Sequence, residues 1–453
     1  MLEDIAGMTP TTLTTPVGTQ PEHDTRLHER ILTREARIGV VGLGYVGLPL
    51  ALEFARAGFS VTGLDSDEKK VDRVNTRRSY IEDVADGELE EVADTLRATA
   101  NAAALADVDV VDICVPTPLR KTRDPDLSFV VQAVEAVARH LRPGQLIILE
   151  STTYPGTTEE VVRPILEATG LKAGVDFYVA FSPERIDPGN PNFSTRTIPK
   201  VVGGINKAST DVAVTLYSQI IEHVVPVSSP AVAEMVKLLE NTFRAVNIGL
   251  VNELALMSHK LGIDVWEVID AAKTKPFGFM PFYPGPGLGG HCIPVDPFYL
   301  SWKARQSGFE SRFIELAGHV NGAMPEHVVE RVSEALNSKG LAVRGSRVHL
   351  FGVAYKPDVG DVRESPALDV IGLLHRRGAI VSYTDPYVRS LREGSSTLEG
   401  VDADTAFGRG IDCAVITTNH RCFDYQMIAV RSPLVVDTRN ALRGIPGRHI
   451  FRL

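Results

Sequence analysis

Two stretches of this chain alternate short β-branched runs with segments of helical periodicity, and this pattern constrains the fold more than any other feature. In the first stretch, which begins at Ala36, apolar runs occupy 37–43, 59–65, 108–115, 145–152 and 177–184. They are apolar on both faces, as strands buried between two helix layers must be. The alternation predicts βαβ units around a parallel, doubly wound sheet.

The second stretch begins at Arg347, with apolar runs at 347–355, 379–386, 412–418 and 433–439. Between the two stretches, residues 231–263 contain no proline and repeat apolar side chains at steps of three and four. This spacing predicts one long amphipathic helix or two abutting helices. The predicted fold is therefore α/β, with two Rossmann-like doubly wound domains joined by a long central helix or helical domain.

The length of 453 residues exceeds what one hydrophobic core supports, so several compact units are expected. We predict a disordered N-terminal extension over 1–35, because this segment is rich in Thr, Pro and polar groups and lacks a signal-peptide core. The first Rossmann domain should then cover 36–225, the helical domain 226–335 and the second Rossmann-like domain 336–453.

Composition excludes several classes of function. The net charge of −10 opposes non-specific nucleic-acid binding, and no apolar run approaches the length of a membrane span. The four cysteines form neither a CxxC pair nor a metal-ligand pattern, so we expect no disulfide framework and no metal site. These features fit a cytoplasmic protein in a reducing compartment.

A dinucleotide fingerprint stands at the start of the first Rossmann pattern. Gly42, Gly44 and Gly47 follow a predicted strand and open an apolar helix, which is the context that the G-x-G-x-x-G motif requires. The second predicted strand ends in Asp65, where a carboxylate would bind the adenosine ribose hydroxyls and repel a 2′-phosphate. The pattern therefore predicts NAD as the cofactor.

A cysteine in a flexible segment is the main candidate for chemistry. Residues 283–298 place four glycines and four prolines around Cys292, and Asp296 follows four residues later. Glycines allow a ligand to approach the backbone closely, so a nucleophilic thiol is plausible there. Spacing alone does not distinguish this nucleophile from an unreactive loop cysteine.

Three further polar residues bear on the role of Cys292. Lys237 and Asn241 are four residues apart, so on a helix they share one face and would form a donor pair suited to an oxyanion. Glu184 follows a predicted strand, at the sheet edge where α/β domains bind ligands. Taken singly, Lys237 could be a solvated helix lysine and Glu184 a surface carboxylate.

The combination resembles the UDP-sugar 6-dehydrogenase family, which includes UDP-glucose dehydrogenase and bacterial UDP-N-acetylhexosamine dehydrogenases. The resemblance runs from Arg37 to Arg439 and rests on seven ordered blocks. These are GLGYVGLPLA (42–51), VPTP (115–118), ESTTYPGTT (150–158), SPER (182–185), EMVKLLENTFRAVNI (234–248), GGHCIPVDP (289–297) and GVAYKPDVGDVRESPA (352–367). Details at 115–130, 181–193 and 281–300 are most similar to bacterial UDP-N-acetylglucosamine 6-dehydrogenases.

The resemblance implies a four-electron oxidation that uses two NAD per sugar. The C6 alcohol would become an aldehyde, Cys292 would capture it, and a second hydride transfer would leave a thioester that water hydrolyses to the uronate. Lys237 and Asn241 match the pair that stabilises the oxyanion, and Glu184 matches the acid/base residue of hydrolysis. Asp296 and Thr152 match residues that order water or assist proton transfer.

The resemblance also implies the binding residues and the assembly. Around NAD it places Gly42, Gly44, Tyr45, Val46, Gly47, Asp65, Lys70, Thr117, Thr152 and Arg363. Around the UDP-sugar it places Glu184, Arg185, Lys237, Asn241, Tyr283, Gly289, Tyr355, Lys356 and Arg439, with the second Rossmann-like domain holding UDP. Because apolar positions on 231–263 are too numerous for one buried face, we also predict a homodimer through this helix.

Alternatives remain at two levels. Within the family, UDP-glucose or UDP-N-acetylmannosamine could replace UDP-N-acetylglucosamine, because the choice depends on a few contacts to the sugar. A two-electron dehydrogenase of the 3-hydroxyacid or 6-phosphogluconate type would share the first domain and the long helix. It would not need a thiol or the region from Arg347 to Arg439. A non-catalytic NAD-binding protein would leave Cys292, Lys237 and Glu184 without roles.

Overall fold

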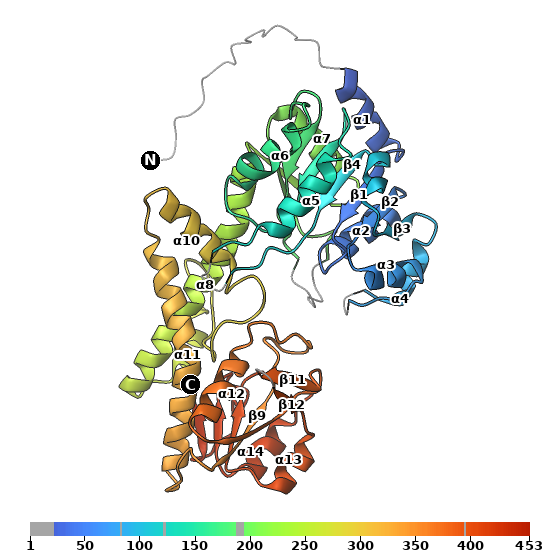
Figure 1. Cartoon of the computed structure of the whole chain (residues 1–453). Helices are drawn as coiled ribbons and strands as arrows, with labels where there is room; N and C mark the ends of the chain where they lie inside the picture. Colours follow the sequence, from blue (N-terminus) through green and yellow to red (C-terminus); the bar gives the residue numbers. More distant parts are fainter. Residues whose placement is uncertain (1–21, 82–83, 121–123, 187–193, 394–395) are drawn as a thin grey trace.

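The computed structural model describes residues 22–81, 84–120, 124–186, 194–393 and 396–453 (Figure 1). Two α/β domains lie at opposite ends of a layer of long helices, and the segment that follows α9 (Val265–Ala272) passes between them. This confirms the predicted fold class. Residues 1–21 lie outside the described part, as do residues 187–193 of the segment 181–193 that carries part of the family resemblance.

The N-terminal domain is built on an eight-stranded sheet in the order β3-β2-β1-β4-β5-β6-β7-β8. All neighbours are parallel except β6 and β7. The strands are β1 (Arg37–Val41), β2 (Ser60–Leu64), β3 (Leu96–Thr99), β4 (Val110–Ile113), β5 (Leu146–Leu149), β6 (Tyr178–Phe181), β7 (Lys200–Gly204) and β8 (Val224–Val227). Because β1, β2, β4, β5 and β6 run in one direction, their carboxyl ends form one edge, where ligands of such sheets bind.

Alternate residues of these strands enter separate cores. Val110 and Ile148 pack under α2 (Gly47–Arg56) and α7 (Lys207–Tyr217), while Val111 and Ile147 pack under α5 (Ser128–Ala138). The remaining helices around this sheet are α3 (Glu68–Asn75), α4 (Asp86–Glu91), η1 (Ala102–Asp107), the π-helical turn η2 (Thr158–Val162) and α6 (Arg163–Glu167). The period of two along each strand therefore explains why the runs are apolar throughout.

The expectation of disorder over 1–35 is wrong for residues 22–32. Residues Glu22–Leu32 form helix α1, and Leu27 and Ile31 are buried in the core below α7. Arg30 also pairs with Asp109 at 2.7 Å. The polar composition hid two apolar side chains four residues apart, which is enough to dock a short helix on a domain.

The helical layer consists of α8 (Pro230–Leu261), α9, α10 (Asp296–Gln306) and α11 (Arg312–Asn337). Residues 231–261 thus form part of one continuous helix. Gly249 allows α8 and α11 to approach closely, since a Cβ there would lie 3.1 Å from the Cα of Ala317. Asn252 bonds Asn321 at 2.8 Å and accepts from the Gly285 amide at 3.0 Å, which ties the loop before Cys292 to both helices.

The C-terminal domain has a five-stranded parallel sheet in the order β10-β9-β13-β14-β15. Its strands are β9 (Arg347–Phe351), β10 (Ile380–Thr384), β13 (Cys413–Ile416), β14 (Val435–Asp437) and β15 (Ile450–Arg452), with a hairpin of β11 (Ser390–Glu393) and β12 (Ser396–Glu399). Its helices are α12 (Pro366–Arg376), α13 (Ala403–Arg409) and α14 (Tyr425–Arg431). No helix in the described chain has the length and apolar character needed to cross a membrane.

Candidate active site

The glycine-rich turn between β1 and α2 has the shape that a dinucleotide requires. At Gly42, where φ is +94°, a Cβ would lie 2.5 Å from the carbonyl oxygen of Cys114, and at Gly47 it would collide with the turn itself. Gly44 differs, because a Cβ there would meet nothing within 4 Å. The turn is therefore closed on its inner side and open where a pyrophosphate would approach the start of α2.

Asp65 stands at the end of β2, next to this turn. Its carboxylate accepts from the Leu43 amide at 2.8 Å and the Asp67 amide at 2.9 Å, and it lies 3.2 Å from the Lys70 ammonium. These contacts fix its orientation without using every acceptor site of the carboxylate. Together with the open face at Gly44, the residues present fit NAD and its adenosine ribose.

Three distant segments meet beside the turn. The guanidinium of Arg363, which follows β9 in the C-terminal domain, lies 5.2 Å from the ring centroid of Tyr45. The carbonyl of Arg363 accepts from the Gly290 amide at 3.0 Å, two residues before Cys292. Tyr45, Arg363 and the cysteine loop are thus brought together from all three domains.

Cys292 lies four residues before the first residue of α10 and is partly buried. Its carbonyl accepts from the Asp296 amide at 2.8 Å, which holds the loop against the first turn of the helix. Burial raises the pKa of the Cys292 thiol and the charge of Asp296 adds to this, whereas Lys237 and Arg244 oppose it. The free protein therefore holds Cys292 mainly as a thiol, so attack on a carbonyl requires a base to remove its proton.

Lys237 and Asn241 lie on the same face of α8, as predicted, and each contacts another part of the site. The Lys237 ammonium donates to the carbonyl oxygen of Glu184 at 2.5 Å, and the Asn241 amide donates to Asp296 at 2.5 Å. Asp296 is buried, and burial raises its pKa to about 6 despite the Lys237 charge and the Asn241 hydrogen bond. One helix thus joins the cysteine loop to the carboxyl edge of the sheet.

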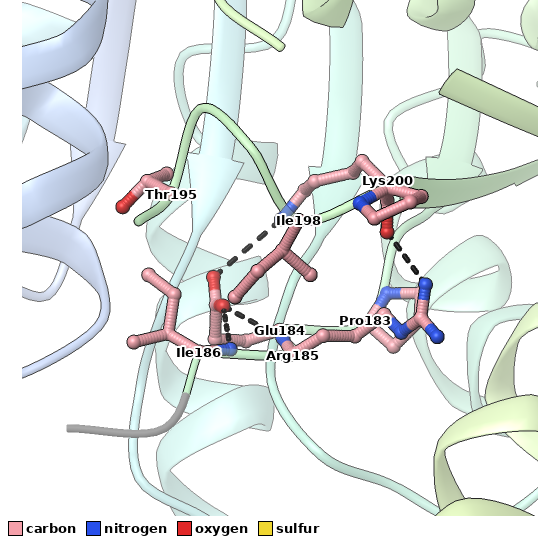
Figure 2. Close-up of a pocket in the computed structure, with 8 residues that line it drawn as sticks. Pro183, Glu184, Arg185, Ile186, Thr195, Ile198 and Lys200 are labelled. Carbon is pink, nitrogen blue, oxygen red and sulfur yellow. Dashed lines mark hydrogen bonds and ion pairs between the residues drawn. The ribbon is translucent and has the colours of Figure 1, made fainter. Parts of the chain in front are cut away.

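Glu184 follows β6 at that edge and is held from two sides (Figure 2). Its Oε1 accepts from the amides of Arg185 and Ile186, both at 2.6 Å, and its Oε2 lies 3.5 Å from the ammonium of Lys200. Burial raises the pKa of Glu184, but Lys200 and the hydrogen bonds to the carboxylate outweigh burial, so the pKa lies below its ordinary value. Glu184 is therefore an ionised acceptor at neutral pH.

The C-terminal domain contributes side chains to the cysteine loop. A Cβ at Gly289 would lie 2.6 Å from the Cβ of Tyr355, so the loop packs directly against this side chain. A Cβ at Gly285 would meet the Arg439 guanidinium at 2.6 Å. Arg439 donates to the Thr417 carbonyl at 2.9 Å, and burial lowers its pKa to about 10. This places a partly buried cation where the loop meets the C-terminal sheet.

Other predicted residues lie at the margins of this arrangement. Tyr283 stacks on Trp266 and its hydroxyl lies 2.9 Å from Asp270, so it is turned toward α9.

The other predicted residues lie on several elements. Arg185 pairs with Glu240 at 2.6 Å. Thr152 and Thr117 follow β5 and β4 at the carboxyl edge, where Thr117 is buried and its carbonyl accepts from the Tyr299 hydroxyl at 2.8 Å. The Lys356 ammonium lies 6.0 Å from the ring centroid of Tyr355. Val46 directly precedes α2.

Two charged residues near the site were missed by sequence reasoning. Arg244 lies seven residues after Lys237 on α8 and its charge lowers the pKa of Cys292, so helical spacing from Lys237 and Asn241 could have found it. Lys200 begins β7 and contacts Glu184 because β7 runs antiparallel to β6. No local pattern in the sequence signals that pairing.

Known proteins are similar to this chain over most of its length. Three consecutive family models match, described as the NAD binding domain (36–221), the central domain (231–323) and the UDP binding domain (349–444) of the UDP-glucose/GDP-mannose dehydrogenase family. The chain is 36% identical to a UDP-N-acetyl-D-mannosamine dehydrogenase of Pyrococcus horikoshii, over 92% of this chain and 98% of that protein. It is 38% identical to a UDP-N-acetyl-D-glucosamine 6-dehydrogenase of Pseudomonas aeruginosa, over 78% and 84%.

A solved structure is similar over the same extent. The UDP-D-ManNAc dehydrogenase from Pyrococcus horikoshii superposes with a TM-score of 0.84 at 35% identity, covering 92% of this chain and 98% of that one. The α1 helix precedes the region that the family models match, which begins at residue 36.

Proposed function

Because the chain belongs to the UDP-glucose/GDP-mannose dehydrogenase family, we propose that it oxidises the C6 alcohol of a UDP-linked N-acetylhexosamine to the carboxylate. It is an NAD-dependent UDP-sugar dehydrogenase. The observation that supports this reaction most directly is the convergence of Cys292, Lys237, Asn241, Asp296 and Glu184 at the carboxyl edge of the NAD-binding sheet. We assign NAD binding to 36–225, the central helical domain with the cysteine loop to 226–335, and UDP binding to 336–453.

When bound, NAD would accept a hydride from C6 in each of the two oxidations. In the first oxidation the C6 hydroxyl proton would pass to solvent through the water that we assign to Asp296 and Thr152. Cys292 gives up its proton to a nearby base such as Asp296 and adds to the C6 aldehyde, forming a thiohemiacetal. In the free protein Lys237 donates to the Glu184 carbonyl oxygen and Asn241 donates to the Asp296 carboxylate. When the oxyanion forms on C6, both side chains leave these partners and donate to it. Loss of the second hydride leaves a thioester on Cys292.

Hydrolysis then releases the product. Glu184 takes a proton from the water that attacks the thioester carbonyl, and the bond from C6 to the Cys292 sulfur breaks. We assign the ordering of this water to Asp296 and Thr152. We assign the binding of the nucleotide and sugar to Tyr283, Gly289, Tyr355, Lys356 and Arg439. Arg439 supports this assignment because it offers a partly buried cation to a diphosphate.

For the sugar, we propose UDP-N-acetylglucosamine, with UDP-N-acetylmannosamine as the second candidate. Both appear among the names of relatives at 36–38% identity, and the two sugars differ only in the configuration at C2. The test is a panel of UDP-N-acetylglucosamine, UDP-N-acetylmannosamine and UDP-glucose, compared by kcat/KM with NAD. A preference for UDP-glucose over both N-acetyl sugars would reject the proposal.

We further propose a homodimer formed through α8. Seven large apolar side chains of this helix are at least 39% exposed and recur at helical spacing, namely Val232, Met235, Leu239, Phe243, Leu250, Met257 and Leu261. Such a continuous apolar stripe on a soluble protein marks an interface. Light scattering should give twice the chain mass of 49.2 kDa, and a monomer would contradict the proposal. The four free cysteines support a reducing, cytoplasmic location.

A further inference from the structure

A group of buried charges lies behind Glu184, on the α7 side of the sheet. Lys200, Glu150 and Asp112 come from β7, the end of β5 and the middle of β4, and Tyr217 comes from α7. All four are buried, with exposed side-chain fractions of 6% for Lys200 and 0% for Glu150. The Lys200 ammonium contacts the Glu150 carboxylate and lies 3.5 Å from Glu184. None of these residues has a role in the reaction described above.

The geometry of Tyr217 fixes the number of protons in this group. Its hydroxyl oxygen lies 2.8 Å from Asp112 Oδ2 and 2.7 Å from Glu150 Oε2. A phenol has one proton to donate, so one of the two carboxyls must itself be protonated and donate to the phenol oxygen. In agreement, burial raises the pKa of Asp112 to about 6 and raises that of Glu150 well above its ordinary value. The pair therefore shares one proton at neutral pH.

Lys200 already supplies the cation of this group. Ligand atoms of Asp112, Cys114 and Glu150 lie within 4.8 Å of one another, a separation that could suit a metal ion. However, the Lys200 ammonium already contacts Glu150, and burial raises the pKa of the Cys114 thiol, which disfavours the thiolate that a metal prefers. The buried ammonium thus balances the carboxylates in place of a metal, and its nearest anions are Glu150 and Glu184.

We propose that Lys200 is a positioning residue for Glu184, held in place by the proton-sharing group of Asp112, Tyr217 and Glu150. This proposal rests on the proposed function, in which Glu184 takes the proton of the hydrolytic water. Lys200 keeps Glu184 ionised and fixes Oε2, while the amides of Arg185 and Ile186 fix Oε1. The shared proton neutralises one of the three carboxylates, so the Lys200 ammonium balances two negative charges and not three.

The other described charges near Glu184 either lower its pKa as Lys200 does or are paired with another side chain. Lys237 on α8 lowers the pKa of Glu184, and the neighbouring Glu150 side chain acts in the same direction. Arg185 faces Glu240 instead, at 2.6 Å. The base in thioester hydrolysis is therefore set by buried groups of the sheet, one layer away from the reacting atoms.

The test compares Lys200→Met, Lys200→Arg and Glu150→Gln with the wild-type enzyme and with Glu184→Gln. Each full-length protein is mixed with UDP-N-acetylglucosamine and excess NAD, and quenched samples are weighed by intact mass spectrometry for a sugar thioester on Cys292. The pH dependence of hydrolysis is followed in parallel. Lys200→Met should accumulate the thioester and slow hydrolysis by up to about tenfold at neutral pH, whereas Glu184→Gln, which has no base, should slow it roughly 10²-fold.

The pH dependence separates positioning from a loss of structure. Without the ammonium the pKa of Glu184 rises, so the acidic limb of the hydrolysis profile should move up by about one to three pH units in Lys200→Met. Lys200→Arg keeps the charge and should restore the limb. Glu150→Gln removes an anion that competes for Lys200, so the acidic limb of its hydrolysis profile should stay in place or move down.

Two results would overturn the proposal while leaving the proposed function intact. These are an unchanged limb in Lys200→Met despite thioester accumulation in Glu184→Gln, and an upward shift in Glu150→Gln equal to that in Lys200→Met. If Lys200→Met does not fold, Lys200→Gln provides the neutral variant with hydrogen bonds to both carboxylates. Failure of the wild-type enzyme to form two NADH per sugar would instead reject the proposed function.

Discussion

Ionisable groups are partly or fully buried both in the cysteine loop and at the sheet edge by Glu184, but their pKa values shift in opposite directions. In the loop, burial outweighs the opposing charges, so the pKa of Cys292 is raised and that of Asp296 reaches about 6. At the sheet edge, burial is outweighed by Lys200 and backbone amides, so the pKa of Glu184 is lowered. A contacting cation therefore decides which carboxyl stores a proton and which accepts one.

This difference matches the order of the proposed reaction. A thiol that holds its proton until substrate arrives is protected from reaction with other electrophiles. A carboxylate that is already ionised can take a proton from water as soon as the thioester forms. The two regions are joined by α8, through Lys237 on Glu184 and Asn241 on Asp296.

The largest effect is expected when the thiol of the cysteine loop is removed. Cys292→Ala should lower uronate formation on the order of 10⁴-fold or more, because the second oxidation has no thiol to form the thiohemiacetal. NAD affinity by calorimetry should not change, since the dinucleotide turn is separate. Cys422→Ala, at an exposed thiol, is the matched control and should keep full activity. Undiminished NADH production by Cys292→Ala would reject the covalent route.

The next prediction compares how Asp296 and Glu184 change the free energy of unfolding with pH. The folded pKa of Asp296 is raised, so its contribution to stability is complete below the unfolded pKa of about 4 and is lost as pH rises through about 6. Asp296→Asn should therefore gain on the order of 2 kcal/mol over wild type between pH 4 and 8, measured by urea unfolding.

Glu184→Gln should show the opposite sign. The folded pKa of Glu184 is lowered, so its contribution is present above the unfolded pKa and is lost as pH falls through the folded value. This variant should lose stability relative to wild type as pH rises. Ile31→Ala, in the buried face of α1, is the control, because it should cost about 2–4 kcal/mol at every pH. The same sign for both carboxyl variants would refute the comparison.

A smaller effect is expected at a third buried carboxylate. Asp65 is held by the amides of Leu43 and Asp67, and in the proposed site it also binds the adenosine ribose. Asp65→Asn should weaken NAD about tenfold by loss of charged hydrogen bonds, and should leave UDP-sugar affinity unchanged. Calorimetric titrations with each ligand measure both quantities, and equal NAD affinity in variant and wild type would exclude Asp65 from the cofactor site.

The smallest effect concerns the reactivity of the resting thiol. The Asp296 charge raises the pKa of Cys292 and the Lys237 charge lowers it. Iodoacetamide should therefore modify Cys292 about threefold faster in Asp296→Asn and about threefold more slowly in Lys237→Met at pH 7.5. Peptide mass spectrometry gives the rate, with exposed Cys422 as the reference in the same molecule. Changes in the reverse order would contradict the electrostatic assignment.

Much of the fold follows from patterns that are local in the chain. The run at 37–43 and the glycines at 42, 44 and 47 predict β1, the turn and α2, because each feature depends on neighbours in sequence. Residues 231–263 predict α8 in the same way. The helix α1 was missed because burial of Leu27 and Ile31 depends on a distant helix, α7.

The site divides along the same line. Lys237, Asn241 and Glu184 were predicted from helical spacing, a strand end and a family resemblance. Lys200 was not, because a lysine before an apolar run is ordinary and its partner Glu184 is found only through the antiparallel pairing of β6 and β7. The proton shared by Asp112 and Glu150 depends on Tyr217, which lies 67 residues beyond Glu150.

The most direct test of the central claim is the number of NADH molecules formed per UDP-N-acetylglucosamine consumed by the wild-type enzyme, with the product identified by mass. A cysteine-dependent four-electron oxidation predicts two NADH and a uronate. One NADH per sugar, with an aldehyde or ketone as the final product, would contradict it.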